Sequence, residues 1–233
     1  MQLWLPTVWR AARTADADQS SDCLACGGSG CGMCKAKEMA DLKLEGLPFD
    51  KEVFLCCFFP LRDDVLERLC DIAELQQAVN RPDANFLDLG CGDGRVVLEV
   101  VQRFRCKGVG VDLDNDLIEV ANKATQSLSE DIRDRVTFVR EDFRNTSLKE
   151  ANAVFIFLPE HICDYVMSQV LAKSDLRAEV PIIVCARESW RPRNAATLSL
   201  VHVRSYPVKR GNVTMGGTMC LHIYSRSSPK LTW

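Results

Sequence analysis

The fold is decided by one stretch of the chain, Phe86-Leu87-Asp88-Leu89-Gly90-Cys91-Gly92-Asp93-Gly94. Its apolar beginning predicts a buried strand over Asn85–Leu89. The apolar residues that follow are three or four positions apart, on one face of a helix, and predict a helix over Arg95–Phe104. Glycines at alternate positions in between allow a sharp turn with positive φ and let a ligand approach the main chain. The helix start also offers unpaired amides. A plain strand-to-helix turn is the alternative.

Outward from this turn, strand-like and helical patterns alternate, which predicts βαβ units and a mostly parallel sheet. The fourth expected strand is almost wholly apolar, as a central strand covered on both faces should be. A last pair of β-prone stretches is joined by a turn-rich segment and predicts an antiparallel pair. The expected strands after the first are Val109–Val111, Val136–Val139, Ala153–Leu158, Pro181–Ala186, Leu198–Val203 and Met219–Tyr224, with helices from about Asn115 and over Glu160–Ala172.

Before the first strand, apolar residues from Val65 to Ala73 recur at helical spacing, and Asp63 is positioned to cap that helix. We therefore expect three parts: a Cys/Gly-rich segment 1–47, an α/β domain 48–226 and a tail 227–233.

Acidic residues around the glycine turn predict the ligand. Asp112 ends the second strand, 18 residues after Gly94, close to the spacing at which an acid takes ribose hydroxyls in nucleotide-binding folds. Dinucleotide sites use G-x-G-x-x-G to seat a pyrophosphate, whereas this turn is G-x-G-x-G and contains Asp88 and Asp93. Because anionic side chains repel a pyrophosphate and attract a sulfonium and an ammonium, the turn favours S-adenosylmethionine over NAD.

After the third strand, Asp142 offers an acceptor for an adenine amino group and Phe143 an aromatic wall. A loop cap is the alternative for Asp142.

With these motifs, the chain resembles the class I methyltransferase family over roughly residues 49–224. The resemblance implies a Rossmann-like α/β fold with a seven-stranded sheet whose last strand is antiparallel. It also implies that the turn and Asp88 hold the methionine end of S-adenosylmethionine, that Asp112 binds the ribose and that Asp142 contacts adenine. The residues expected at the cofactor are Asp88, Gly90, Cys91, Gly92, Asp93, Gly94, Asp112, Leu113, Asp142, Phe143 and Phe157.

The segment after the fourth strand, Phe157-Leu158-Pro159-Glu160-His161, lacks the Asp/Asn-Pro-Pro-aromatic tetrad of enzymes that methylate amino groups of nucleic-acid bases. Three short stretches resemble the protein-lysine methyltransferases that act on the ATP synthase c subunit and the adenine nucleotide translocase, with their prokaryotic relatives: Leu158-Pro159-Glu160, Trp190-Arg191-Pro192 and Phe59-Pro60. The resemblance implies a protein substrate methylated on lysine. The hydrophobic membrane anchor typical of the mitochondrial members is missing from this sequence.

Acceptor-side candidates are Glu160, His161, Glu188 and Trp190, which follow the carboxyl ends of strands, where open α/β sheets bind ligands. Capping or packing is the alternative for each. Lysine methylation needs mainly positioning and desolvation of a neutral amine, so a dedicated base is not required. His202 and His222 look structural.

Cys23, Cys26, Cys31 and Cys34 form two C-x-x-C pairs, and four thiolates can surround one Zn²⁺. Structural zinc sites usually separate their pairs by a dozen or more residues, so this short spacing leaves an iron-sulfur cluster, unliganded thiols or disulfides as alternatives to a zinc knuckle. The other eight cysteines lie in apolar segments, as reduced buried thiols do.

Composition limits the remaining choices. The net charge is −3 and basic residues are scattered, which makes a nucleic-acid substrate less expected, and no apolar run approaches a membrane span. Reduced cysteines favour an intracellular, cytoplasmic location, although the acid-free start 1–13 is also typical of an organellar transit peptide. A non-catalytic cofactor-binding scaffold, a small-molecule or RNA methyltransferase and a dehydrogenase are the rival functions.

Overall fold

The computed structural model describes residues 58–193, 200–208 and 218–226. The described residues from Pro60 onward belong to one compact unit. The predicted Cys/Gly-rich segment 1–47 and the tail 227–233 lie outside the described residues, so the predicted division of the chain into three parts stays a prediction.

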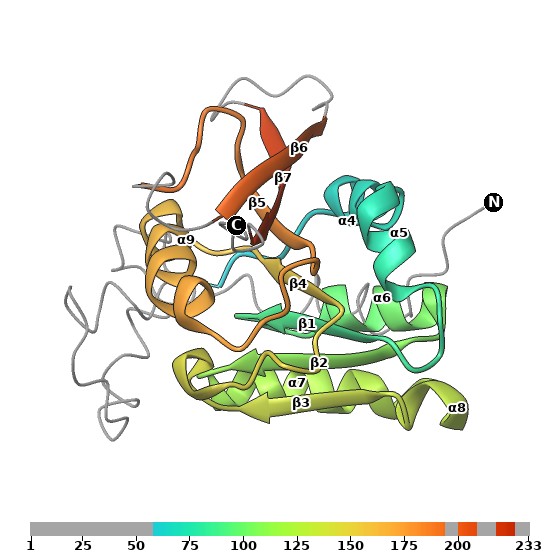
Figure 1. The fold of residues 1–233 in the computed structure, drawn as a ribbon. Coiled ribbons are helices and arrows are strands. Elements are labelled where there is room, and N and C mark those ends of the chain that lie inside the picture. The colour runs from blue at the N-terminus through green and yellow to red at the C-terminus, as the bar shows by residue number, and fades with distance from the viewer. Residues whose placement is uncertain (1–57, 194–199, 209–217, 227–233) are drawn as a thin grey trace. The chain divides into compact units, whose positions relative to one another are not determined.

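The domain is built on a seven-stranded sheet with the order β3-β2-β1-β4-β5-β7-β6 (Figure 1). Strand β7 pairs antiparallel with both β5 and β6, while every other pairing is parallel. This confirms the predicted seven-stranded sheet with an antiparallel last strand. The strands are β1 (Asn85–Leu89), β2 (Lys107–Asp112), β3 (Val136–Arg140), β4 (Ala153–Ile156), β5 (Ile182–Arg187), β6 (Leu200–Val208) and β7 (Met219–Arg226).

Most differences from the expected strands are of one or two residues, but β6 runs five residues beyond the predicted Val203. Its second half pairs with β7 after a register shift between His202 and Arg204. That half contains Arg204, Ser205 and Pro207, residue types that carry little strand signal, and only the pairing with β7 makes it a strand.

Six α-helices lie in the described residues. They are α4 (Asp63–Cys70), α5 (Ala73–Val79), α6 (Arg95–Phe104), α7 (Asn115–Gln126), α8 (Glu130–Arg133) and α9 (Glu160–Tyr165), which continues as a π-helical turn (Val166–Val170) and a 3₁₀ turn (Leu171–Lys173); a further 3₁₀ turn is Phe143–Asn145. The single helix expected over Glu160–Ala172 is thus present with a change of hydrogen-bond pattern after Tyr165. No helix in the described ranges is long and apolar enough to cross a membrane.

The predicted cap at Asp63 is wrong. Arg62 occupies the N-cap position without a side-chain cap, and Asp63 and Asp64 lie in the first turn of α4. The side chain of Arg62 bonds to Asp64 instead, with Nε 3.0 Å from Oδ1. The expected single helix is also two, because Ile72 is extended between α4 and α5.

The core lies on both sides of the central strands. Strand β4 is wholly buried, as predicted for a central strand, and it pairs with β1 on one side and β5 on the other. Its residues Ala153 and Phe155 join the core cluster that includes buried residues of α4, α5 and α6. Since side chains alternate along a strand, Val154 and Ile156 are buried on the opposite face. The sheet edge at the carboxyl ends of β1, β2, β4 and β5 is therefore rigidly supported.

Gly94 is required by both conformation and space. Its φ is +78°, and a Cβ there would lie 2.4 Å from Cζ of Phe138 and 2.8 Å from Cβ of Ala121. We expect Gly94→Ala to lower the free energy of unfolding by about 2–4 kcal/mol, the sum of a left-handed backbone and overpacking. Denaturant titration measures this loss. Gly90→Ala, where the three atoms nearest to a Cβ belong to the flexible side chain of Leu158, should cost less, and the reverse ranking would contradict this account of the turn.

Candidate functional site

The glycine turn joins β1 to α6 and is fixed to the end of β2. Gly90, Gly92 and Gly94 have φ values of 81°, 53° and 78°, in agreement with the predicted need for glycine. The amides of Gly90 and Cys91 both donate to the carbonyl of Val111, at 2.8 and 3.0 Å. These bonds hold the turn at the carboxyl ends of two adjacent parallel strands, where such sheets bind ligands.

Asp88 is a buried carboxylate without a compensating charge. Only 2% of the residue is exposed, and no hydrogen-bond donor or basic side chain pairs with its carboxylate in the part of the chain that the structure describes. Burial, followed by the negative charges of Asp112 and Asp93, raises the pKa of Asp88 well above its ordinary value. Such a group is costly when ionised unless a cation approaches it.

Asp112 ends β2 beside this carboxylate. Its Oδ2 accepts the amide of Gly92 at 2.8 Å, and its Oδ1 accepts the amide of Asp114 at 2.9 Å. Burial raises the pKa of Asp112, and these backbone hydrogen bonds oppose the rise. Each carboxylate oxygen has more than one lone pair, so both can still accept a bond from a ligand.

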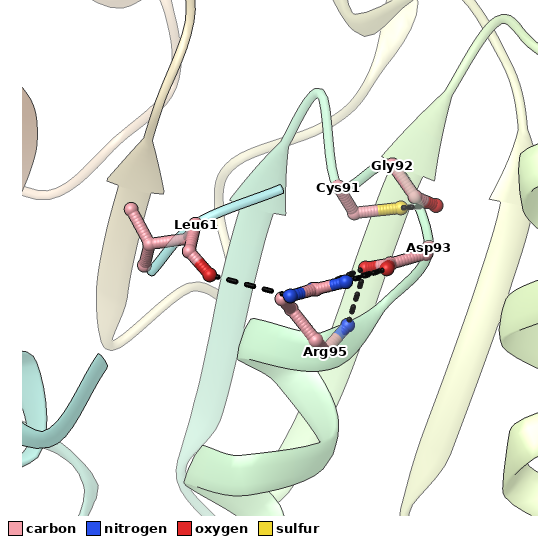
Figure 2. A network of polar contacts seen from close by, with 5 residues as sticks. All are labelled: Leu61, Cys91, Gly92, Asp93 and Arg95. Atoms are coloured by element: carbon pink, nitrogen blue, oxygen red, sulfur yellow. Dashed lines mark hydrogen bonds and ion pairs between the residues drawn. The ribbon is translucent and has the colours of Figure 1, made fainter. Parts of the chain in front are cut away.

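Asp93 is already paired within the chain. Its Oδ2 lies 2.5 Å from Nη2 of Arg95, and the backbone amide of Arg95 donates to its Oδ1 at 3.2 Å. The other end of the same guanidinium donates to the carbonyl of Leu61 at 3.4 Å, so Arg95 lies between Leu61 and Asp93 (Figure 2). Of the amides expected to be unpaired at the helix start, that of Arg95 is taken by Asp93. Asp93 therefore adds little negative charge for a ligand.

Asp142 adopts the geometry of a loop cap. Its Oδ1 accepts the amide of Arg144 at 2.9 Å and its Oδ2 lies 2.7 Å from Nε of Arg144. The amide of Glu141 donates to the carbonyl of Asp112 at 3.0 Å, which brings this loop to the end of β2. Phe143 is buried behind it. The predicted contact of Asp142 with adenine stays a prediction.

The other residues expected at the cofactor are apolar and close to the turn. Cys91 and Leu113 are buried, and Phe157 is a partly buried residue at the end of β4. Burial raises the pKa of Cys91 well above its ordinary value, and its thiol lies 3.8 Å from the carbonyl of Gly92 (Figure 2). Cys91 is thus a neutral thiol at neutral pH and acts as a small apolar surface.

A hollow of about 640 Å³ opens at the carboxyl ends of β4 and β5. It brings together three of the acceptor-side candidates, Glu160, His161 and Trp190, while Glu188 is not part of its lining. Trp190 is only 6% exposed. Arg187 binds Glu160 with Nε 2.6 Å from Oε1 and lowers the pKa of that carboxyl, which makes Glu160 a weak base. The ion pair with Arg187 therefore disfavours Glu160 as a general base.

Sequence reasoning missed the charged lining of this hollow. Arg187, Arg191, Arg193 and Asp164 belong to it, and Asp164 Oδ2 lies 3.1 Å from Nε of Arg193. Three arginines within seven residues after a buried strand were the available signal.

His222, by contrast, is wholly buried and bonds to the carbonyl of Arg187 and the hydroxyl of Ser205, at 3.0 and 2.9 Å, so it packs as a core residue. The same hydroxyl of Ser205 also bonds to Nε2 of His202, at 2.7 Å.

The predicted zinc site stays a prediction. Cys23, Cys26, Cys31 and Cys34 lie outside the described residues. Among the described residues, no group of three or more His, Cys, Asp or Glu side chains could hold a metal ion.

The chain is similar to known methyltransferases. Residues 88–192 match the family model described as the ANTKMT methyltransferase domain. A protein-lysine N-methyltransferase of Saccharolobus islandicus is 29% identical over 102 residues, 43% of this chain and 59% of the relative. A trans-aconitate 2-methyltransferase of Sinorhizobium medicae is 36% identical over 89 residues, 38% of this chain and 34% of the relative. The matches thus span between a third and three fifths of these relatives.

Solved structures share the fold at low identity. An RNA methyltransferase from Salinibacter ruber in complex with S-adenosyl-L-homocysteine has a TM-score of 0.53 at 22% identity, covering 74% of this chain and 97% of that one. A magnesium protoporphyrin IX methyltransferase from Synechocystis with bound S-adenosylmethionine has a TM-score of 0.54 at 16% identity, covering 70% and 78%. Together with the strand order, these similarities identify the fold as that of the class I methyltransferases.

The buried charge of Asp88 predicts a pH dependence of stability. A carboxyl whose pKa is raised in the folded state binds more protons there than in the unfolded chain, so its contribution to stability falls as pH rises from about 4 toward the folded pKa. We expect Asp88→Asn to be more stable than the wild type at pH 7, with a gap that widens by up to about 1.4 kcal/mol per pH unit in this window. Denaturant titrations of the ligand-free protein at pH 5 and pH 7 measure it.

Asp83→Asn, at an acid whose side chain is 80% exposed, is the control and should follow the wild type. Equal stability of Asp88→Asn and the wild type at both pH values would contradict the unpaired charge.

Proposed function

We propose that this chain, whose described part is a class I methyltransferase domain, transfers a methyl group from S-adenosylmethionine to lysine side chains of a protein. The observation that carries the proposal is the buried carboxylate of Asp88, which has no cationic partner in the described residues. Asp112 stands beside it at the end of the adjacent strand. A ligand that bears an ammonium, a sulfonium and ribose hydroxyls complements both acids.

The residues present fit that donor. The left-handed glycines expose main chain at the turn, so the methionine part can lie against Gly90–Gly94 near Asp88. Asp112 is suited to the ribose hydroxyls, and the loop with Asp142 and Phe143 to the adenine. Cys91, Leu113 and Phe157 supply apolar surface around these groups. Solved structures of the same fold hold S-adenosylmethionine or S-adenosyl-L-homocysteine, which supports the assignment.

A dinucleotide fits less well. Asp88 and Asp112 would both face a pyrophosphate, and the guanidinium of Arg95, which is bonded to this turn, is held by Asp93 and Leu61. Two like unit charges about 4 Å apart repel each other by about 4 kcal/mol at an effective dielectric constant of about 20. A dehydrogenase is therefore disfavoured.

On the acceptor side, the hollow beside Phe157 and Trp190 suits a long, apolar lysine stem. The donor supplies a methyl group on a positively charged sulfur; the lone pair of the acceptor nitrogen forms the new N–C bond, and the electrons of the broken C–S bond go to sulfur. The protein's part is to hold the neutral amine in line and exclude water, which can contribute about 7–11 kcal/mol to lowering the barrier. No described side chain needs to act as a base.

Two comparisons support lysine as the acceptor: the ANTKMT family match over residues 88–192, and the protein-lysine methyltransferase of Saccharolobus islandicus. A second candidate acceptor is a small carboxylic acid. The observation that favours it is the arginine-containing hollow, and the relatives named for trans-aconitate act, by that name, on a polycarboxylate.

The partner, the location and the metal complete the proposal. A protein substrate is expected rather than a nucleic acid, because the chain carries a net charge of −3. A cytoplasmic location, with an organelle as the alternative, and a zinc knuckle at the four N-terminal cysteines rest on the sequence alone.

Labelled methyl transfer tests the proposal. We expect the wild type, incubated with cell extract and labelled donor, to place label in protein that yields methyl-lysine on acid hydrolysis. Asp112→Ala should lower donor affinity about tenfold or more, since charged hydrogen bonds to hydroxyls are lost. Calorimetry with the donor measures affinity, and Asp83→Ala serves as the matched control.

Label in small molecules alone would favour the carboxylic acid alternative. Absence of donor binding at millimolar concentration would contradict the proposed function as a whole.

A further inference from the structure

The charges of the acceptor hollow do not cancel. Among the described residues, its lining holds two carboxylates and three guanidinium groups. Glu160 is bound by Arg187, and Asp164 is bound by the side chain and the backbone amide of Arg193, at 3.1 Å in both cases. Arg191 has no acidic partner in the described residues. The hollow therefore carries about one excess positive charge, in a chain whose net charge is −3.

The guanidinium of Arg191 is anchored through one nitrogen, which leaves the N–H donors of its other two nitrogens without an acceptor in the described residues. Its Nη1 donates to the carbonyls of Glu188 and Trp190, at 2.8 and 2.6 Å. A guanidinium has five N–H donors, and neither Nε nor Nη2 of Arg191 bonds to an acceptor in the part of the chain described. The two carbonyls fix the group at the wall of the hollow, which both Arg191 and the buried Trp190 line. A fixed guanidinium edge with free donors matches a carboxylate in bidentate geometry.

We propose that Arg191 is a specificity-determining residue that binds an aspartate or glutamate next to the target lysine. The inference rests on the proposed lysine acceptor and narrows it to lysines in an acidic context. An excess positive charge disfavours a lysine flanked by basic residues, because the basic neighbours would add to a positive charge that the lining does not compensate. An acidic neighbour supplies the missing charge, and because residues in an extended peptide are spaced only ~3.3 Å apart, we expect it within two positions of the lysine.

A polyanion is a poorer occupant of the same hollow. The carboxylates of Glu160 and Asp164 stay beside the arginines that bind them. A single excess charge neutralises only one phosphate, whereas nucleic-acid binding depends on many such contacts. One carboxylate on a protein substrate is the acceptor feature that fits this charge balance.

A peptide series tests the inference. Each peptide carries a central lysine, and the two positions on either side are alanine, aspartate or arginine in turn. We expect the wild type to have a kcat/KM about 5-fold higher for aspartate-flanked than for alanine-flanked peptides, a size suited to one partly exposed ion pair. The difference should lie mainly in KM, and arginine-flanked peptides should be the poorest.

Arg191→Met keeps the stem and removes the charge, so the preference should disappear while donor affinity by calorimetry stays unchanged. Arg191→Lys keeps the charge without the bidentate edge and should retain part of the preference. The matched control is Arg177→Met. Arg177 lines a separate hollow of about 500 Å³ at the amino ends of β4 and β5 and also donates to a backbone carbonyl, that of Ala151 at 2.9 Å. This variant should behave as the wild type.

An aspartate preference that survives in Arg191→Met, or a wild type that methylates all peptides equally, would overturn the inference and leave the proposed function standing. Binding of the donor with methylation of no peptide would overturn the lysine acceptor itself, and the inference with it.

Discussion

The carboxylate of Asp88 is held at the end of β1 by the sheet, and burial raises its pKa because the described residues offer it no cation. A protein does not keep such a group ionised without a partner, and the remaining charges of the turn do not supply one. Arg95 lies next to the turn, but its guanidinium is shared between Asp93 and the carbonyl of Leu61. The turn is therefore arranged so that one acid is compensated internally and Asp88 is left for a ligand.

The rest of the donor side depends on keeping that acid near the carboxyl end of β1, beside the glycine turn. The glycines let the turn bend close to Val111 and place Gly92 against Asp112. Phe138 and Ala121 fill the space that a side chain at Gly94 would need. On the acceptor side the uncompensated charge is positive instead of negative. Glu160 and Asp164 are compensated by arginines, and Arg191 is left with free donors, so a cationic donor and an acceptor with a negative charge would meet at one sheet edge.

Sequence predicts those features that depend on neighbours along the chain. The helix Arg95–Phe104 and the strand Asn85–Leu89 have the predicted bounds because apolar periodicity and the glycine turn define them locally. The second half of β6, from Arg204 onward, was missed because its strand conformation comes from pairing with β7. The prediction that Asp63 caps α4 was wrong because the helix begins one residue earlier, with Arg62 at the N-cap position and bonded to Asp64. Composition does not reveal this pairing.

Charge pairing explains what sequence could not assign at the site. Asp88, Asp93 and Asp112 look equivalent as acids near a turn, yet only the structure distinguishes the unpaired Asp88 from the paired Asp93. Likewise Glu160 was a candidate as an acid after β4, and its partner Arg187 lies 27 positions further along the chain. The arginines after β5 were visible as a cluster, but which one lacks a partner depends on Glu160 and Asp164 from a different segment.

Proton release on donor binding is the most direct measure of the unpaired carboxylate. Calorimetric titrations of S-adenosylmethionine into the protein near pH 6, in two buffers with different ionisation enthalpies, count the protons that binding releases or takes up. If a cation completes the charge of Asp88, binding lowers the pKa of this carboxyl, so protons are released by the wild type and not by Asp88→Asn. Binding without proton release in the wild type, or with equal release in the variant, would contradict the account.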